Sequence, residues 1–565
     1  MRRFLKEHAA KTPISFHMPG HKGSGIFRRY GYGDFLNNLI DYDLTEIPGA
    51  DNLFQAEGIL MDVQKKYAEL YDVKHSYLLI NGTSGGILAS VLAAVKPGGK
   101  LIMARNCHKS VFNALTLGQI EPVYAQPTLL EEQGITGAVS PEEIERCLAE
   151  NPDAQAVILP SPNYYGICSD IRAIAEIVHR AGKVLITDQA HGAHLKFFHK
   201  FGYGSGMPPA AEDCGSDITI CSIHKTLASI TQSAVLNLNS DRIDRYLLED
   251  KLQAVESTSP SYLLMGFLDV NADLLMNYGK EAIGSWSENV GWFYKAAEDI
   301  EGLAVLQTNA DSNAGPDSIR YAEGNSANRR EGLDRTKINL DMSSLGISGA
   351  RLEELLMEDN IFSELHTGNI LMLMTGIGNT RSDMEKAIAS LKKIAETARK
   401  ASFAGPSAGS PVQIASAAAG PDIGSPAGQT AQIGPGAGSP VESAAPEIES
   451  AASGTVLADA GLRMTISGAA LKAEAVSADS KKVRRVPTAG ALHEIPAEKE
   501  FVLLEKSAGR LCAGSIIPYP PGIPLVCPGE EITAGIVSYI GALRAAGEKV
   551  IGVNDRGEVL VGKQD

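Results

Sequence analysis

The stretch Ile218-Thr219-Ile220-Cys221-Ser222-Ile223-His224-Lys225-Thr226 indicates both a fold class and a chemistry. Its first five residues form a short apolar run, which is typical of a buried strand. Lys225 follows this run closely. A lysine amine can condense with an aldehyde, and several enzymes hold an aldehyde-bearing cofactor in this way. Because most lysines are only solvated surface charges, the case for Lys225 depends on the sequence around it.

Strand and helix patterns alternate through the first half of the chain. Helical patterns separate the apolar runs, for example over Ile171–Arg180, and the connections are short. This alternation predicts an α/β domain with a parallel sheet covered on both faces. The other predicted strands of this region are Tyr77–Ile80, Lys100–Ala104, Ala156–Leu159 and Val184–Asp188.

The pattern changes after Asp269, and a second, smaller α/β domain is predicted there. Its elements are a strand near Thr336–Leu340, a helix over Ala350–Glu358, an apolar run at Ile370–Met374 and a last helix over Arg381–Lys400.

The clearest boundary in the chain is a change of composition at Ala401. From Ala401 to Leu462 there is no Lys or Arg, and Ala, Gly, Ser and Pro dominate. Such a segment has too little apolar surface to offset its ordering entropy, which favours a flexible linker over an ordered Ala-rich helix. The predicted divisions are an N-terminal segment at 1–30, a large domain at 31–270, a small domain at 271–400, a linker at 401–462 and a C-terminal domain at 463–565.

Composition narrows the class of protein. The formal charge of −16 argues against a nucleic-acid partner and suits a cationic small molecule. No run of eighteen apolar residues is present, so no membrane span is expected. The seven cysteines are scattered and odd in number, as in a cytoplasmic protein with free thiols. His191 and His194 have metal-ligand spacing without a third ligand nearby, so no metal site is predicted.

Polar features follow several of the predicted strands. Asp188 ends one strand, where its carboxylate can pair with a protonated pyridine nitrogen. The turn Asn81–Gly86 precedes a helix and can hold a phosphate through main-chain N–H groups. His108 follows the next strand, where it can lie against an aromatic ring. Ligands of α/β sheets collect at the carboxyl ends of the strands, so these residues and Lys225 together predict a pyridoxal phosphate site.

Several motifs also resemble those of the Orn/Lys/Arg decarboxylases, which are bacterial fold-type-I pyridoxal phosphate enzymes acting on basic amino acids. The resemblance covers about 10–400 and 463–565, and its motif set is specific. The matching segments are His17-Met18-Pro19-Gly20-His21-Lys22-Gly23, Asn81-Gly82-Thr83-Ser84, Asn106-Cys107-His108-Lys109-Ser110, Asp188-Gln189-Ala190-His191-Gly192-Ala193-His194, Ser222-Ile223-His224-Lys225, Ser257-Thr258-Ser259-Pro260-Ser261-Tyr262, Pro518-Tyr519-Pro520-Pro521-Gly522-Ile523-Pro524 and Cys527-Pro528-Gly529-Glu530.

The resemblance implies a mostly parallel seven-stranded sheet, a C-terminal α+β domain and a role for each matching residue. Lys225 is expected to carry the cofactor, Asp188 to partner its ring nitrogen, and His108 to stack on its ring. His191 is expected in the same pocket, and His224 is a second candidate acid beside Lys225. The residues expected around the phosphate are Thr83, Ser84, Ser222 and His224, with Thr258 or Ser259 reaching the phosphate of a partner in a homodimer.

The sequence departs from the family pattern at three places. About sixteen residues precede His17, so the resemblance is to the short form without an N-terminal receiver-like domain. Gln189 stands where the family usually has an acid, and Lys196 lies a few residues further on. The linker is an insertion relative to compact members.

The expected activity is decarboxylation of a basic amino acid, with arginine favoured over lysine and ornithine. Glu530 is a candidate to bind the distal cation of the substrate, and the alternative is that it caps a helix beginning near Ile532. Two other readings of the chain stay open: an aminotransferase or aldolase of the same fold, and an inactive paralogue that binds a partner.

Overall fold

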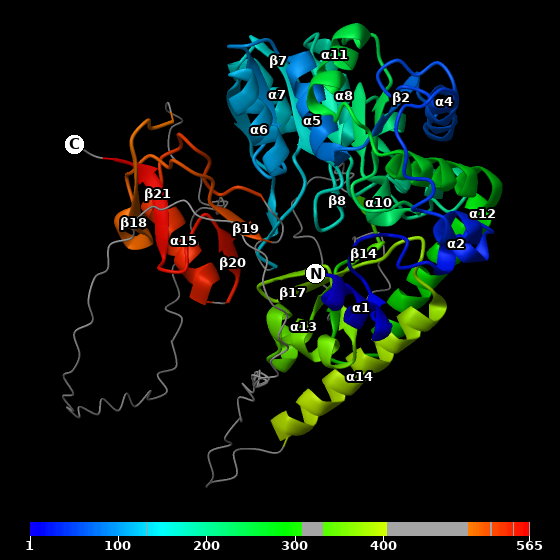
Figure 1. The fold of residues 1–565 in the computed structure, drawn as a ribbon. Coiled ribbons are helices and arrows are strands. Elements are labelled where there is room, and N and C mark those ends of the chain that lie inside the picture. The colour runs from blue at the N-terminus through cyan, green and yellow to red at the C-terminus, as the bar shows by residue number, and fades with distance from the viewer. Residues whose placement is uncertain (131–132, 308–331, 404–494, 520–522, 546, 564–565) are drawn as a thin grey trace, which may run out of the picture. The chain divides into compact units, whose positions relative to one another are not determined.

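The structure is a computed structural model that describes residues 1–130, 133–307, 332–403, 495–519, 523–545 and 547–563 (Figure 1). These residues belong to one compact unit, formed by 1–405 and 483–565. The predicted linker at 401–462 lies outside the described residues except for its first three positions. Those three positions end helix α14 (Arg381–Phe403).

A seven-stranded mixed sheet forms the centre of the large domain. Its order is β2-β11-β10-β9-β7-β3-β4. Neighbouring strands from β10 to β4 are parallel, whereas β11 runs antiparallel to both β10 and β2. The mostly parallel seven-stranded sheet expected from the sequence is therefore confirmed. The strands are β2 (His75–Leu79), β3 (Lys100–Ala104), β4 (Glu121–Ala125), β7 (Ala154–Pro160), β9 (Val184–Asp188), β10 (Ile218–Cys221) and β11 (Ala234–Leu238).

Both faces of this sheet are covered. Every residue of β9, β10 and β11 is buried, which explains why these strands appear as continuous apolar runs and not as an alternating pattern. Figure 1 shows helices gathered around the strands. These helices are α4 (Ile59–Tyr71), α5 (Gly82–Ala94), α6 (Lys109–Gly118), α7 (Pro141–Glu150), α8 (Ile171–Arg180) and α11 (Arg245–Val255).

Helix α5 begins inside the segment predicted as a turn. Gly82 is its first residue, five positions before the predicted start at Ile87. Gly86 allows close packing of the helix on the sheet, and Gly85 allows the close approach of the Glu256 side chain. A Cβ at Gly86 would lie 2.6 Å from Leu79 Cδ1 and 3.0 Å from Ile220 Cγ2. The proposed phosphate turn is therefore the first turn of a helix.

The second domain contains a four-stranded antiparallel sheet in the order β12-β14-β17-β16. Its strands β14 (Lys337–Asp341) and β17 (Ile370–Met374) match the predicted runs, and α13 (Gly349–Glu358) matches the predicted helix. The short edge strands are β12 (Ala304–Val305) and β16 (Leu365–Thr367).

Helix α12 (Tyr262–Glu298) joins the two α/β domains. The domain boundary proposed at 270 falls inside this helix, so the division at that point stays a proposal. Both tryptophans of the chain lie on α12, and Trp286 is buried against the second domain through a hydrogen bond from its Nε1 to Thr375 Oγ1 (2.8 Å).

The described C-terminal residues form two antiparallel strand pairs and one helix around a small apolar core. β18 (Lys499–Leu503) pairs with β21 (Glu558–Gly562), and β19 (Ile517–Tyr519) pairs with β20 (Lys549–Ile551), both antiparallel. Helix α15 (Ala534–Ala545) supplies Ile536, Ile540 and Leu543 to the core. The α+β character expected for this domain is present in these elements.

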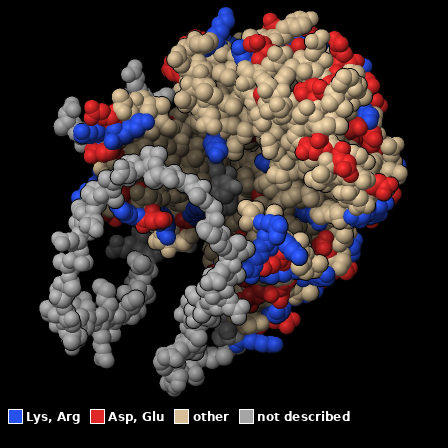
Figure 2. Space-filling view, viewed as in Figure 1, with Lys and Arg blue, Asp and Glu red and all other residues tan. Residues whose placement is uncertain are grey.

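The surface carries mixed charge on the face shown in Figure 2, where Lys and Arg lie among Asp and Glu. Among the described residues, no helix is both long and apolar enough to cross a membrane.

Candidate active site

The candidate site lies at the carboxyl edge of the central sheet. Strands β2, β3, β9 and β10 all run in the same direction, so the segments that follow them meet at this edge. Those segments carry Thr83, His108, Asp188 and Lys225, which the sequence analysis took from four separate motifs.

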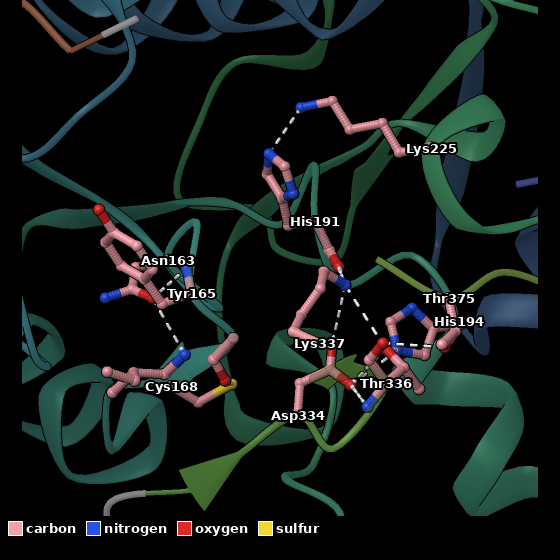
Figure 3. Close-up of polar contacts among 12 residues, drawn as sticks. Asn163, Tyr165, Cys168, His191, His194, Lys225, Asp334, Thr336, Lys337 and Thr375 are labelled. Atoms are coloured by element: carbon pink, nitrogen blue, oxygen red, sulfur yellow. Dashed lines mark hydrogen bonds and ion pairs between the residues drawn. The ribbon is translucent and has the colours of Figure 1, made fainter. Parts of the chain in front are cut away.

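Lys225 lies on the one-turn helix α10 (Ile223–Thr226) directly after β10. Its Nζ is 2.9 Å from Nε2 of His191 (Figure 3). Burial lowers the pKa of the Lys225 amine, and the opposite charge of Asp188 only partly compensates. A lysine with a lowered pKa exposes its lone pair more readily, which is what nucleophilic attack on an aldehyde requires.

His191 lies beside Lys225 on the loop after β9. Its ring centroid is 4.4 Å from that of Tyr164, and among the described residues its Nδ1 has no hydrogen-bond partner. Burial, reinforced by the charge of Lys225, lowers the His191 pKa well below its ordinary value. His191 is therefore a neutral ring with one buried nitrogen still able to bind a ligand.

Asp188 is a buried carboxylate at the last position of β9. One of its oxygens accepts a hydrogen bond from the main-chain N–H of Ala190 at 3.1 Å. Burial raises the Asp188 pKa, while the charge of Lys225 opposes the change. No cation lies within ion-pair distance of it among the described residues. A buried carboxylate without a paired cation stabilises a cationic ligand group that binds next to it.

His108 caps the first turn of α6. Its Nδ1 accepts a hydrogen bond from the main-chain N–H of Ser110 at 3.3 Å and lies 2.8 Å from the Ser110 hydroxyl. Burial, together with the charge of Lys225, lowers the His108 pKa to about 4. The imidazole is therefore neutral near pH 7 and is held by its own helix.

Two hydroxyl groups meet at the start of α5. Thr83 Oγ1 lies 3.3 Å from Ser222 Oγ, and the exposed Ser84 follows in the same first turn. His224 is turned to its own loop, since its Nδ1 lies 3.0 Å from the carbonyl oxygen of Ser233. Burial lowers the His224 pKa to about 4. The hydroxyls and the helix N-terminus form a cluster of donors suited to a phosphate.

The N-terminal motif packs against the lysine loop. The N–H of Gly20 donates to the carbonyl oxygen of His224 at 2.7 Å. A Cβ at Gly20 would lie 2.3 Å from the carbonyl carbon of Thr226, so only glycine allows this approach. The motif His17–Gly23 thus supports the backbone that carries Lys225.

Thr258 and Ser259 are not brought to the other site residues. Both are exposed in the loop between α11 and α12. Such positions remain open to a second subunit.

Glu530 has partners that neither sequence reading anticipated. Its carboxylate accepts hydrogen bonds from Tyr124 Oη (2.6 Å) and from the main-chain N–H of Cys527 (2.8 Å), and it lies 3.6 Å from Arg105 Nη2. Arg105 also donates to the carbonyl oxygens of Pro524 and Leu525. The described contacts of Glu530 therefore anchor the C-terminal loop to strands β3 and β4, and none goes to the first turn of α15.

Gln189 and Lys196 are two positions at which the sequence departs from the family pattern. Both side chains contact residues other than Lys225. Gln189 Nε2 donates to Glu212 Oε2 at 2.8 Å, and Lys196 Nζ pairs with Asp213 at 2.5 Å and with Asp72 at 3.0 Å. Both side chains thus strengthen the scaffold behind the site.

Sequence reasoning missed several residues around Lys225. Glu364 is buried beside the site and accepts hydrogen bonds from Tyr164 Oη (3.0 Å) and the Met18 main-chain N–H (2.9 Å). Lys337 and Asp334 form a buried pair behind His191 (Figure 3). Their only sequence signal is charge at the start of a predicted strand, where a solvated position is the ordinary interpretation.

The arrangement fits a phosphorylated pyridine aldehyde. Lys225 supplies the amine, Asp188 a carboxylate for a ring nitrogen, His191 a free buried nitrogen, and Thr83 with Ser222 the phosphate donors.

Two sequence families match the chain. The family described as "Orn/Lys/Arg decarboxylase, major domain" matches residues 1–383, and "Orn/Lys/Arg decarboxylase, C-terminal domain" matches residues 469–557. The first match covers more than half of the chain. The chain belongs to the Orn/Lys/Arg decarboxylase family. It is a carboxy-lyase of basic amino acids.

Curated relatives agree with this assignment, and solved structures share the fold. The decarboxylase is 28% identical over 557 residues to an arginine decarboxylase of Bacillus subtilis, covering 98% of this chain and 94% of that one. It is 23% identical to a lysine decarboxylase of Pseudomonas aeruginosa, covering 95% of this chain and 75% of that one. The fold matches the constitutive lysine decarboxylase of Escherichia coli with a TM-score of 0.64 at 18% identity, over 100% of this chain and 82% of that one.

Proposed function

We propose that this decarboxylase converts arginine to its amine and carbon dioxide, using pyridoxal phosphate bound by Lys225. The observation that carries the proposal is the group formed by the partly buried Lys225 with the buried His191 and Asp188 at the carboxyl edge of the sheet. Arginine is favoured over lysine because arginine decarboxylases of bacilli match this chain at 27–30% identity, against 23% for the lysine enzymes.

When bound, pyridoxal phosphate supplies an electron-poor ring that accepts the electron pair left on the α-carbon as carbon dioxide departs. In the proposed site, Asp188 holds a proton at the ring nitrogen, because a buried carboxylate is stabilised by an adjacent cation. His108 would contact the ring as a neutral imidazole. Thr83, Ser84, Ser222 and His224 would hold the phosphate.

Lys225 is proposed to move the proton that completes the reaction. Its Nζ lies 2.9 Å from His191 Nε2, and with its lowered pKa the Lys225 amine would take the proton that the substrate ammonium loses and later donate it to the α-carbon. Asp188 and His191 beside Lys225 are buried, and a site poor in water favours loss of charge from a carboxylate.

Glu530 is proposed to hold the C-terminal loop against strands β3 and β4, since its carboxylate already contacts Arg105 and Tyr124. Through Arg105 it secures the segment that leads from β3 to His108. A direct contact between Glu530 and the distal cation of the substrate would require one of these partners to be displaced.

We also propose that the active unit is at least a homodimer and that it works in the cytoplasm, where its seven free cysteines stay reduced. Several large apolar side chains are exposed, as expected of a surface covered by a second subunit. They include Ile40, Ile47, Ile59 and Tyr246, exposed by 85%, 53%, 54% and 77%.

A substrate panel tests the proposal. Purified enzyme with added pyridoxal phosphate is incubated separately with arginine, lysine and ornithine, and both carbon dioxide and the organic product are quantified. Equal amounts of carbon dioxide and the arginine-derived amine, at a rate at least about tenfold above that with lysine, are expected; this ratio corresponds to roughly 1.4 kcal/mol.

Two outcomes would replace the proposal. Release of a keto acid without carbon dioxide would indicate an aminotransferase. Absence of any product together with absence of cofactor binding would indicate an inactive paralogue. Preference for lysine or ornithine would correct the substrate and leave the reaction type in place.

A further inference from the structure

Lys337 is a fully buried cation at the first position of β14. Its Nζ donates a hydrogen bond to the carbonyl oxygen of His191 at 2.8 Å, and it pairs with Asp334 Oδ2 at 3.0 Å (Figure 3). A buried charge is retained in a fold only when it is paired and hydrogen-bonded, and Lys337 meets both conditions.

Asp334 is the counter-ion of this lysine and is itself fully buried. Its other oxygen, Oδ1, accepts hydrogen bonds from the main-chain N–H and the hydroxyl of Thr336, at 3.0 Å and 2.7 Å, and lies 3.1 Å from Nε2 of His194. These charged contacts hold the pKa of Asp334 far below its ordinary value, although burial alone would raise it. Asp334 is thus ionised, and both of its carboxylate oxygens have partners.

The backbone is shaped to admit this lysine. Gly166 has a φ of +91°, and a Cβ there would lie 2.9 Å from Lys337 Cβ and 3.0 Å from the carbonyl oxygen of Asp334. The N–H of Asp334 in turn donates to the Gly166 carbonyl oxygen at 2.8 Å. The close approach excludes any larger residue at position 166.

The pair of Asp334 and Lys337 connects the smaller sheet to the loop that follows β9 of the central sheet. Asp334 and Lys337 lie at the start of a strand of the smaller sheet, whereas His191 and His194 lie on the loop that follows β9 of the central sheet. Lys337 holds the main chain of this loop at His191, and Asp334 holds its other end at His194. The ring of His191 lies between this pair and Lys225.

We propose that Lys337, with Asp334 as its counter-ion, is a positioning residue that fixes the 189–194 loop and so keeps the His191 ring against Lys225. The inference deepens the proposed function, because it assumes that Lys225 is the reactive lysine. Lys337 contacts neither the substrate nor the reacting atoms. It acts through His191.

The test is a double substitution, Lys337→Met with Asp334→Asn, studied first in the cofactor-free protein. Removing both charges avoids leaving one charge buried alone, and asparagine retains the Oδ1 acceptor for Thr336. Hydrogen exchange measured by mass spectrometry is expected to be at least about tenfold faster in peptides spanning 189–194, and unchanged in peptides spanning β3 and β4. Lys196→Met is the matched control, since it removes a nearby buried lysine that does not contact His191.

Loaded enzyme gives a second readout. In the double variant the visible circular dichroism band of the bound cofactor is expected to change and kcat to fall at least about tenfold, with KM for the substrate within threefold. Unchanged exchange at 189–194 would overturn the proposal, and so would a uniform rise of exchange across the central sheet, which would show that the pair acts only on overall stability. Because exchange is measured without substrate, this result stands whether or not arginine is decarboxylated.

Discussion

Asp188 is the carboxylate on which the proposed electron sink depends. Asp188→Asn keeps the size of the side chain and an acceptor for the Ala190 N–H, so the variant is expected to fold and to bind cofactor. It cannot hold a ring nitrogen protonated, and kcat should fall about 10³-fold, which is roughly 4 kcal/mol of transition-state stabilisation. The measurement is steady-state carbon dioxide release; activity within threefold of wild type would exclude the role.

His108 and His224 predict how stability depends on pH. Burial lowers the pKa of each from 6.5 to about 4 in the folded protein. Between these values the unfolded chain binds more protons than the folded chain does, so the stability of the cofactor-free protein falls as pH drops from about 6.5 toward 4.

The variant His108→Asn tests this dependence because asparagine still caps α6 and does not titrate. Between pH 6.5 and 5, the wild type is expected to lose up to about 2 kcal/mol more unfolding free energy than the variant. Urea unfolding at both pH values measures the difference. Parallel losses in the two proteins would mean that His108 is protonated normally in the fold.

Single residues also show where sequence reasoning succeeds. Lys225 and Asp188 were found because each follows a buried strand of the same sheet, and parallel strands bring their carboxyl ends together. Lys337 and Asp334 were missed because their partners are distant in the chain: His191 lies 146 residues from Lys337, and His194 lies 140 residues from Asp334. A local pattern cannot distinguish a charge buried by such a contact from a solvated one.

At the scale of elements, the loop 523–530 fastens the C-terminal domain to β3 and β4. Glu530→Gln leaves the buried Arg105 without its charged partner, and losing one partner of such a pair costs about 3–5 kcal/mol. The variant is therefore expected to melt earlier, with KM for the substrate within threefold of wild type. Asp153→Asn is the control, since its ion pair with Lys100 is exposed and contributes less than about 1 kcal/mol.

If Glu530→Gln raised KM strongly and left the melting temperature unchanged, Glu530 would not act by fastening the loop 523–530 to β3 and β4. It would restore the earlier hypothesis that Glu530 binds the distal cation of the substrate.

The elements differ in how well their sequence predicted them. β3, β9 and α8 have the predicted bounds, because their apolar runs end at polar or turn residues. The start of α5 was missed because glycines that allow close packing have the same sequence signal as glycines that form turns. The whole of α12 was missed, although the buried residues of its second half recur at helical spacing, as Ala282, Trp286, Asn289 and Phe293 do.

At the scale of the whole molecule, we propose that a second subunit completes the site. Thr258 and Ser259 are exposed in one chain, and their expected contact is the phosphate bound by the partner. The variant Thr258→Val with Ser259→Ala is expected to weaken cofactor binding about tenfold, roughly 1.4 kcal/mol, without changing dimerisation. Sedimentation velocity with cofactor titration measures both; a fully active monomer would contradict the dimer.

The central claim is that Lys225 holds the cofactor, and chemical labelling tests it most directly. Holoenzyme is reduced with borohydride, digested, and searched by mass spectrometry for the pyridoxyl group on every lysine. The main competitor is Lys22, a half-buried lysine of the N-terminal motif whose pKa burial lowers to about 7. We predict stoichiometric label on Lys225 and no bound label in Lys225→Ala, whereas label on Lys22, Lys337 or any other lysine would contradict the account.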